Sequence, residues 1–90
     1  MRVALICTDK AGALQTRLDN RSAHLAYIAE TGVVEMAGPF LSPEGQMTGS
    51  LVVLEVGSLA EAEAWAAGDP YAQAGLFESV AISEWKKVVG

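Results

Sequence analysis

The apolar run Leu51–Leu54 constrains the fold more than any other part of this 90-residue chain. It lies within residues 48–56, a stretch that has the length and composition of a β-strand. Four consecutive apolar residues leave such a strand without a solvated face. We therefore expect this strand to be covered on both faces, by helices on one and by a second layer on the other.

Three further strands are predicted around it. Val3–Thr8 is a short apolar run that ends at the turn-forming cluster Asp9–Gly12, which indicates a buried strand. Residues 33–40 and 77–85 have strand character as well. Because proline cannot donate to a ladder, Pro39 places the first of these two at a sheet edge or at the strand's exit.

Two helices separate the strands. Between Ala13 and Thr31 the spacing predicts an amphipathic helix, either continuous or in two pieces with Asn20 capping the break. The apolar residues that share one face are Leu14, Leu18, Leu25, Ile28 and Ala29.

The second helix is predicted to end at Gly68. Ser58 at the N-cap and Glu61 three residues later match a capping box at its start. Asp69 followed by Pro70 then begins one more short helical turn, as expected for a capping aspartate before a proline.

The order strand, helix, strand, strand, helix, strand is that of the ferredoxin-like, split βαβ motif. We expect a single α+β domain over residues 1–90, with a four-stranded antiparallel sheet and two helices on one face. The chain is 51% hydrophobic, which is high for so few residues. The economical cover for the other face is the sheet of a second copy, so a homodimer is predicted, and the alternative is a monomer with an unusually full core.

Charge and composition exclude several classes of function. A net charge of −5 with only six basic residues argues against nucleic-acid binding and against anionic membrane surfaces. The one cysteine, Cys7, excludes an intramolecular disulfide and lies in an apolar run, so we interpret it as a small buried hydrophobe. The N-terminal apolar run is too short for a signal peptide, which predicts a cytoplasmic protein.

His24 is the only histidine, and Arg17, Arg21 and Thr31 fall on the same flank of the predicted helix. An imidazole and two guanidinium groups at one border could bind a carboxylate or an enolate oxygen. The simpler interpretation of each arginine is a solvated charge, and that of His24 is a boundary residue hydrated by water. A lone histidine could also act as a general acid or base, whereas no second ligand at metal spacing accompanies it.

Asp69 has two interpretations that the sequence leaves open: a helix cap, or a carboxylate that orients His24 as in a catalytic triad. Tyr71 could present its hydroxyl to a pocket or pack its ring. Ser50 has no base beside it and is interpreted as a hydrogen-bond donor. Gly38 permits close approach of a ligand, although glycines most often make turns.

Six short segments follow one another over nearly the whole chain: 21–25 (RSAHL), 37–39 (AGP), 48–50 (TGS), 64–66 (AWA), 69–72 (DPYA) and 77–80 (FESV). In this order and spacing they resemble the YciI-like family. The resemblance implies a dimeric α/β barrel with a His–Asp pair in a cleft, corresponding to His24 and Asp69, and with Gly38, Pro39 and Ser50 lining that cleft. Similar proteins include muconolactone isomerase-like and monooxygenase-like proteins and, in one branch, dehydrochlorinases of hydroxylated chloroaromatics.

Three functions compete at this point. The first is a small cofactor-free lyase or isomerase in which His24 moves a proton, Asp69 orients it, and Arg21 or an amide near Gly38 holds the substrate's anionic oxygen. The second is a non-catalytic module that binds a small metabolite. The third is an accessory subunit whose dimer surface is its purpose. No phosphate loop or dinucleotide fingerprint is present, so no cofactor is predicted.

Overall fold

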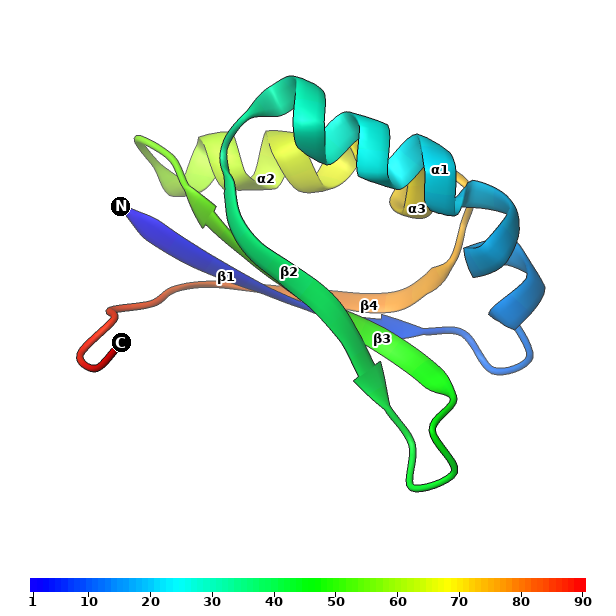
Figure 1. Ribbon diagram of the computed structural model, residues 1–90. Helices are drawn as coiled ribbons and strands as arrows, with labels where there is room; N and C mark the ends of the chain where they lie inside the picture. The colour runs from blue at the N-terminus through cyan, green and yellow to red at the C-terminus, as the bar shows by residue number, and fades with distance from the viewer.

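Four antiparallel strands form one sheet in the spatial order β2-β3-β1-β4, and the helices lie on one of its faces (Figure 1). The computed structural model describes the whole chain, residues 1–90. Along the chain the elements are β1 (Arg2–Asp9), α1 (Leu14–Thr31), β2 (Val34–Leu41), β3 (Met47–Glu55), α2 (Leu59–Gly68), α3 (Pro70–Gln73) and β4 (Phe77–Glu84). The predicted ferredoxin-like arrangement is confirmed, with β2 and its Pro39 at an edge of the sheet.

The core forms on the face of the sheet that the helices cover. Val3, Leu5 and Cys7 of β1 point toward the helices and are buried. Their partners on β3, which point the same way, are Leu54, Val52 and Ser50. Trp65 of α2 packs on this layer. Ser50 is therefore a buried polar residue at one end of an otherwise apolar layer.

The most deeply buried side chains of α1 are polar, which corrects part of the amphipathic pattern predicted for it, since of the predicted apolar face only Ile28 packs against the core. Arg17 and His24 are the two buried residues of this helix. The exposed residues include three of the apolar positions that were expected to form its inner face: Leu14, Leu18 and Leu25. The helix is also continuous, because the side chain of Asn20 donates to the carbonyl of Thr16 one turn earlier and caps no break. The orientation of α1 follows from partners that Arg17 and His24 find on other elements.

Hydrogen bonds between α1 and α2 fix the two long helices against each other. The Tyr27 hydroxyl donates to the carbonyl of Trp65 at 2.9 Å, and the indole of Trp65 donates to the Thr31 hydroxyl at 2.9 Å. Thr31 therefore serves helix packing and not the site near His24. Gly68 allows this approach, since a Cβ there would lie 2.5 Å from the Tyr27 hydroxyl.

Two N-caps position the helices after β3. Ser58 accepts from the amide of Glu61, as predicted, but the Glu61 carboxylate accepts from the amide of Gly57 instead of closing the capping box on Ser58. Asp69 accepts from the amide of Tyr71 at the start of α3, whose first residue is a proline. The predicted cap at Asp69 is confirmed. None of the helices combines the length and the apolar character that crossing a membrane would require.

The other face of the sheet carries exposed apolar side chains. Ile6 on β1, Met36 and Phe40 on β2 are 42, 48 and 41% exposed. Leu51 pairs with Ile6 in the register and points to the same face. All the helices lie on the opposite side (Figure 1).

Candidate active site

His24 and Asp69 meet, although 45 residues separate them in the sequence. The Nδ1 of His24 lies 2.7 Å from Oδ1 of Asp69, and both side chains are less than a tenth exposed. The same carboxylate oxygen accepts from the amide of Tyr71 at 3.0 Å. Asp69 therefore combines the two interpretations that the sequence left open, since it caps α3 and also binds the imidazole.

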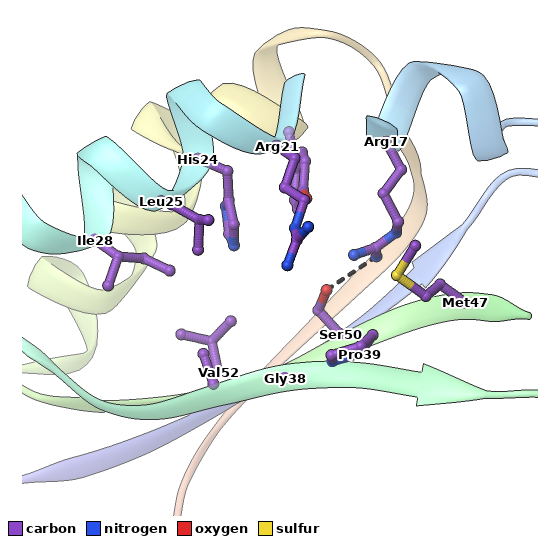
Figure 2. Close-up of a pocket in the computed structure, with 12 residues that line it drawn as sticks. Arg17, Arg21, His24, Leu25, Ile28, Gly38, Pro39, Met47, Ser50 and Val52 are labelled. Atoms are coloured by element: carbon purple, nitrogen blue, oxygen red, sulfur yellow. Dashed lines mark hydrogen bonds between the residues drawn. The ribbon is translucent and has the colours of Figure 1, made fainter. Parts of the chain in front are cut away.

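The Asp69 contact selects the tautomer of the neutral imidazole. A carboxylate accepts hydrogen bonds only, so it favours the proton on Nδ1 and leaves the lone pair on Nε2. Figure 2 shows the ring of His24 pointing from α1 toward the sheet, into the space between them. This is the arrangement that a histidine needs to take a proton from a ligand.

Tyr71 packs against the two buried side chains of α1. Its ring stacks on the imidazole of His24, with centroids 3.9 Å apart and an angle of 13° between the planes. Arg17 also lies over this ring, with its guanidinium carbon 4.9 Å from the centroid. Burial raises the pKa of the Tyr71 hydroxyl although Arg17 and Arg21 lower it, so the phenol is neutral near pH 7. The ring thus limits how far both side chains can move.

Arg17 forms a buried ion pair, which corrects its interpretation as a solvated charge. Its Nε and Nη2 bind the two carboxylate oxygens of Asp9 at 2.8 and 2.9 Å, and Nη2 also donates to the Ser50 hydroxyl at 2.9 Å. Burial lowers the pKa of Arg17, but the hydrogen bond and charge of Asp9 outweigh this and raise it. The guanidinium is therefore permanently charged and held by a fork of two hydrogen bonds.

A cavity of about 190 Å³ lies between α1 and the strands β2 and β3. Six of the seven predicted site residues line it: Arg21, His24, Gly38, Pro39, Ser50 and Tyr71. Only Asp69 does not, because it lies behind the imidazole that it binds. Arg21 projects into the cavity between His24 and Ser50 (Figure 2). Residues that the sequence analysis selected separately therefore share one cavity.

Sequence reasoning missed Asp9 as a site residue and underestimated Arg17. Asp9 was interpreted as part of the turn that ends the first strand, and it does occupy the last position of β1. An aspartate eight residues before an arginine carries no distinguishing pattern, because the pair forms only when α1 folds back over β1. Met47 also lines the cavity, and no sequence signal pointed to it.

Two other types of site receive no support from the arrangement of residues. Cys7 is buried, and burial raises the pKa of its thiol to about 12, so it is an unreactive hydrophobe as predicted. Nowhere do three or more histidine, cysteine, aspartate or glutamate side chains come together in a group that could hold a metal ion.

Comparison with known proteins agrees with the resemblance in the sequence. The YCII-related domain matches residues 1–86. The chain belongs to the YCII-related family. Protein YciI of Escherichia coli O6:H1 is 38% identical to it over 98% of this chain and 99% of the relative. A Haemophilus influenzae protein is 34% identical to this chain over 98% of this chain and 99% of the relative.

One solved structure is similar to this YCII-related chain in both fold and sequence. It is the 5-chloro-2-hydroxyhydroquinone dehydrochlorinase TftG of Burkholderia phenoliruptrix AC1100, in complex with 2,5-dihydroxybenzoquinone. The TM-score is 0.89 at 34% identity, over 96% of this chain and 94% of that one. An antibiotic biosynthesis monooxygenase structure, with a TM-score of 0.60 and 10% identity, shares the fold alone.

Proposed function

We propose that this YCII-related protein is a cofactor-independent lyase or isomerase, with dehydrochlorinase-like chemistry on a small organic acid. His24 is the general base and Asp69 holds it in the reactive tautomer. The observation that carries the proposal is the 2.7 Å contact between His24 Nδ1 and Asp69 Oδ1, made by a histidine whose ring lines the cavity.

The proposed reaction begins with transfer of a substrate proton to Nε2 of His24. The electron pair left on the substrate delocalises onto a conjugated oxygen. In a dehydrochlorination the carbon–chlorine bond then breaks, chloride leaves with the bonding electrons, and the proton on His24 passes to water. In an isomerisation the same proton returns to a different carbon. Asp69 keeps its negative charge throughout and stabilises the imidazolium that forms.

The size of the cavity and the likeness to TftG support a small cyclic substrate. A cavity of about 190 Å³ has room for a single ring with a few substituents. TftG, which matches over nearly its whole length, was solved with a one-ring quinone. The lining of this cavity includes apolar side chains such as Leu25, Ile28 and Val52, which suit the faces of such a ring.

A homodimer in the cytoplasm is part of the same proposal. The exposed apolar side chains Ile6, Met36 and Phe40 gather on the sheet face that no helix covers. A second copy packed face to face would remove them from water. Ile6→Glu places a charge at the centre of this face, and we expect it to reduce the mass measured by sedimentation to that of a monomer. An unchanged mass would show that this sheet face is not the dimer interface.

The direct test is release of chloride from 5-chloro-2-hydroxyhydroquinone by native protein and by His24→Asn. Asparagine can still donate to Asp69, so the variant should fold, but it cannot take a proton. We expect turnover to fall by roughly 10²- to 10⁴-fold with little change in melting temperature. Native turnover in the variant would exclude His24 as the base. If native protein binds the compound without converting it, the protein is instead a small-metabolite-binding module.

A further inference from the structure

The end of the cavity opposite His24 contains a buried hydroxyl, that of Ser50 (Figure 2). Ser50 is 4% exposed, and its oxygen accepts from Nη2 of Arg17 at 2.9 Å. No protein group accepts the proton of this hydroxyl within the site. Because Arg17 has no acceptor to offer, the Ser50 proton is directed away from it, and Ser50 lines the cavity.

Arg21 is the one cation of this site without a carboxylate partner. Arg17 is neutralised by Asp9, whereas Arg21 takes part in none of the ion pairs of the protein. Its guanidinium reaches into the cavity between His24 and Ser50 (Figure 2). The negative charge of Asp69 lies behind the ring of His24 and does not line the cavity. A ligand therefore meets an unpaired positive charge beside His24 and, farther along the cavity, a hydroxyl proton that no protein group accepts.

We propose that Ser50 and Arg21 form an oxyanion-binding subsite, in which the Ser50 hydroxyl donates to the anionic oxygen of the ligand and Arg21 supplies the compensating charge. Arg17 is a positioning residue that occupies the Ser50 lone pair, and Asp9 holds Arg17 in place. The subsite deepens the proposed function, because it is where the charge displaced by His24 would accumulate. Anion binding itself does not depend on proton transfer and can be tested separately.

The arrangement defines a class of ligand. The ligand carries its acidic proton at the His24 end and an anionic oxygen at the Ser50 end, on one conjugated ring. Enolates, carboxylates and hydroxyquinonates meet both requirements. An uncharged ring of the same shape leaves Arg21 without its partner, so the site should discriminate by charge more than by size.

The experiment compares 2,5-dihydroxybenzoate with its uncharged amide by isothermal titration calorimetry at pH 7. The two probes share their ring and shape and differ in charge. We expect native protein to bind the acid at least tenfold more tightly than the amide, and Arg21→Gln to abolish most of this preference. Lys86→Gln removes the same charge from an exposed residue after β4 and is the matched control. Equal binding of acid and amide, or equal effects of the two variants, would overturn the proposal.

A double-mutant cycle tests whether Arg17 acts through Ser50. Ser50→Ala should weaken binding of the acid several-fold with little effect on the amide. If Arg17 positions Ser50, then Arg17→Gln should cost the Ser50→Ala protein much less affinity for the acid than it costs native protein. Additive losses would show that Arg17 has no positioning role. Circular dichroism of each variant identifies any that fails to fold, and Arg17→Lys then replaces Arg17→Gln in the cycle.

The subsite and the proposed reaction can fail independently. His24→Asn should keep the preference for the acid over the amide while losing turnover. Loss of the preference with Arg21→Gln in a protein that never releases chloride would support the subsite and exclude the reaction. Turnover that survives in Arg21→Gln and Ser50→Ala would support the reaction and exclude the subsite.

Discussion

The two ends of the cavity are built alike and behave differently. At each end a basic side chain of α1 binds a carboxylate from another element: His24 binds Asp69 before α3, and Arg17 binds Asp9 at the end of β1. Both contacts are buried, and both basic groups pack on the ring of Tyr71. The difference lies in the basic group, because an imidazole can both accept and release a proton, whereas a guanidinium keeps its charge. The His24–Asp69 pair therefore has the chemistry to transfer a proton. The Arg17–Asp9 pair can only keep a fixed charge and orient Ser50.

The largest effect is expected from breaking the His24–Asp69 pair, which we propose moves a proton. Asp69→Asn keeps a capping side chain for α3, so stability should change little. The amide no longer selects the reactive tautomer of His24, and turnover should fall by roughly 10²- to 10⁴-fold in a chloride-release assay. Asp19→Asn, the same change at an exposed position of α1, is the control and should keep native turnover. A loss of less than twofold in Asp69→Asn would mean that Asp69 is a helix cap only.

Breaking the other pair should cost stability. Asp9→Asn leaves the guanidinium of Arg17 buried without a counter-charge, and we expect the free energy of unfolding to fall by about 3 kcal/mol in urea titrations. Glu35→Gln is the matched control, because it breaks the exposed pair between Glu35 and Arg2 at 2.9 Å. That change should cost less than about 1 kcal/mol. Equal losses in the two variants would show that burial adds nothing to the Asp9 pair.

Tyr71 is shared by the two ends, so its ring tests whether they depend on a common support. Tyr71→Phe keeps the stacking on His24 and the contact with Arg17, whereas Tyr71→Leu removes both. We expect the leucine variant to lose about 1–2 kcal/mol more unfolding free energy than the phenylalanine variant. If the two variants unfold at the same urea concentration, the aromatic contacts do not stabilise the site.

The smallest effect concerns Cys7, whose thiol is influenced by both pairs. Its pKa is raised from 9.0 to about 12 in total: burial is the main cause, the charges of Asp69 and Asp9 add to the rise, and the charge of Arg17 opposes it. In the unfolded chain the Cys7 thiol loses its proton near pH 9, whereas in the folded protein it stays protonated to a higher pH. The protonated thiol therefore contributes its full share of the unfolding free energy below pH 9, and this contribution is lost as the pH rises toward 12. The melting temperature should therefore begin to fall above pH 9.

Cys7→Val separates this effect from those of the tyrosines. Burial also raises the pKa of Tyr27 and of Tyr71 above 10.0. Their ionisation also lowers the stability as the pH rises, but it begins at a higher pH than that of Cys7. The valine variant should keep a flat melting temperature between pH 9 and 10 while the native protein declines. Identical slopes in that window would assign the whole alkaline decline to other groups.

Much of the fold could be predicted because its signals are local. Strand and helix periods, the Asp69 cap before a proline, and the edge position of Pro39 each depend on a few neighbouring residues. The burial of Arg17 and His24 on α1 could not be predicted, because hydrophobicity favoured the leucines. Arg17 and His24 are buried because two carboxylates elsewhere in the chain, those of Asp9 and Asp69, pair with them and offset the cost of their burial.

The sequence by itself determined the order of the elements, the family, and the residue types from which a proton-transfer site could be built. The tertiary structure decided which of those residues meet. Asp69 reaches His24 across 45 positions and Ser50 reaches Arg17 across 33, and these contacts exist only once α1 has packed against α3 and the sheet. No local pattern encodes such pairs, because their energy depends on burial and direction, and the folded chain alone supplies both.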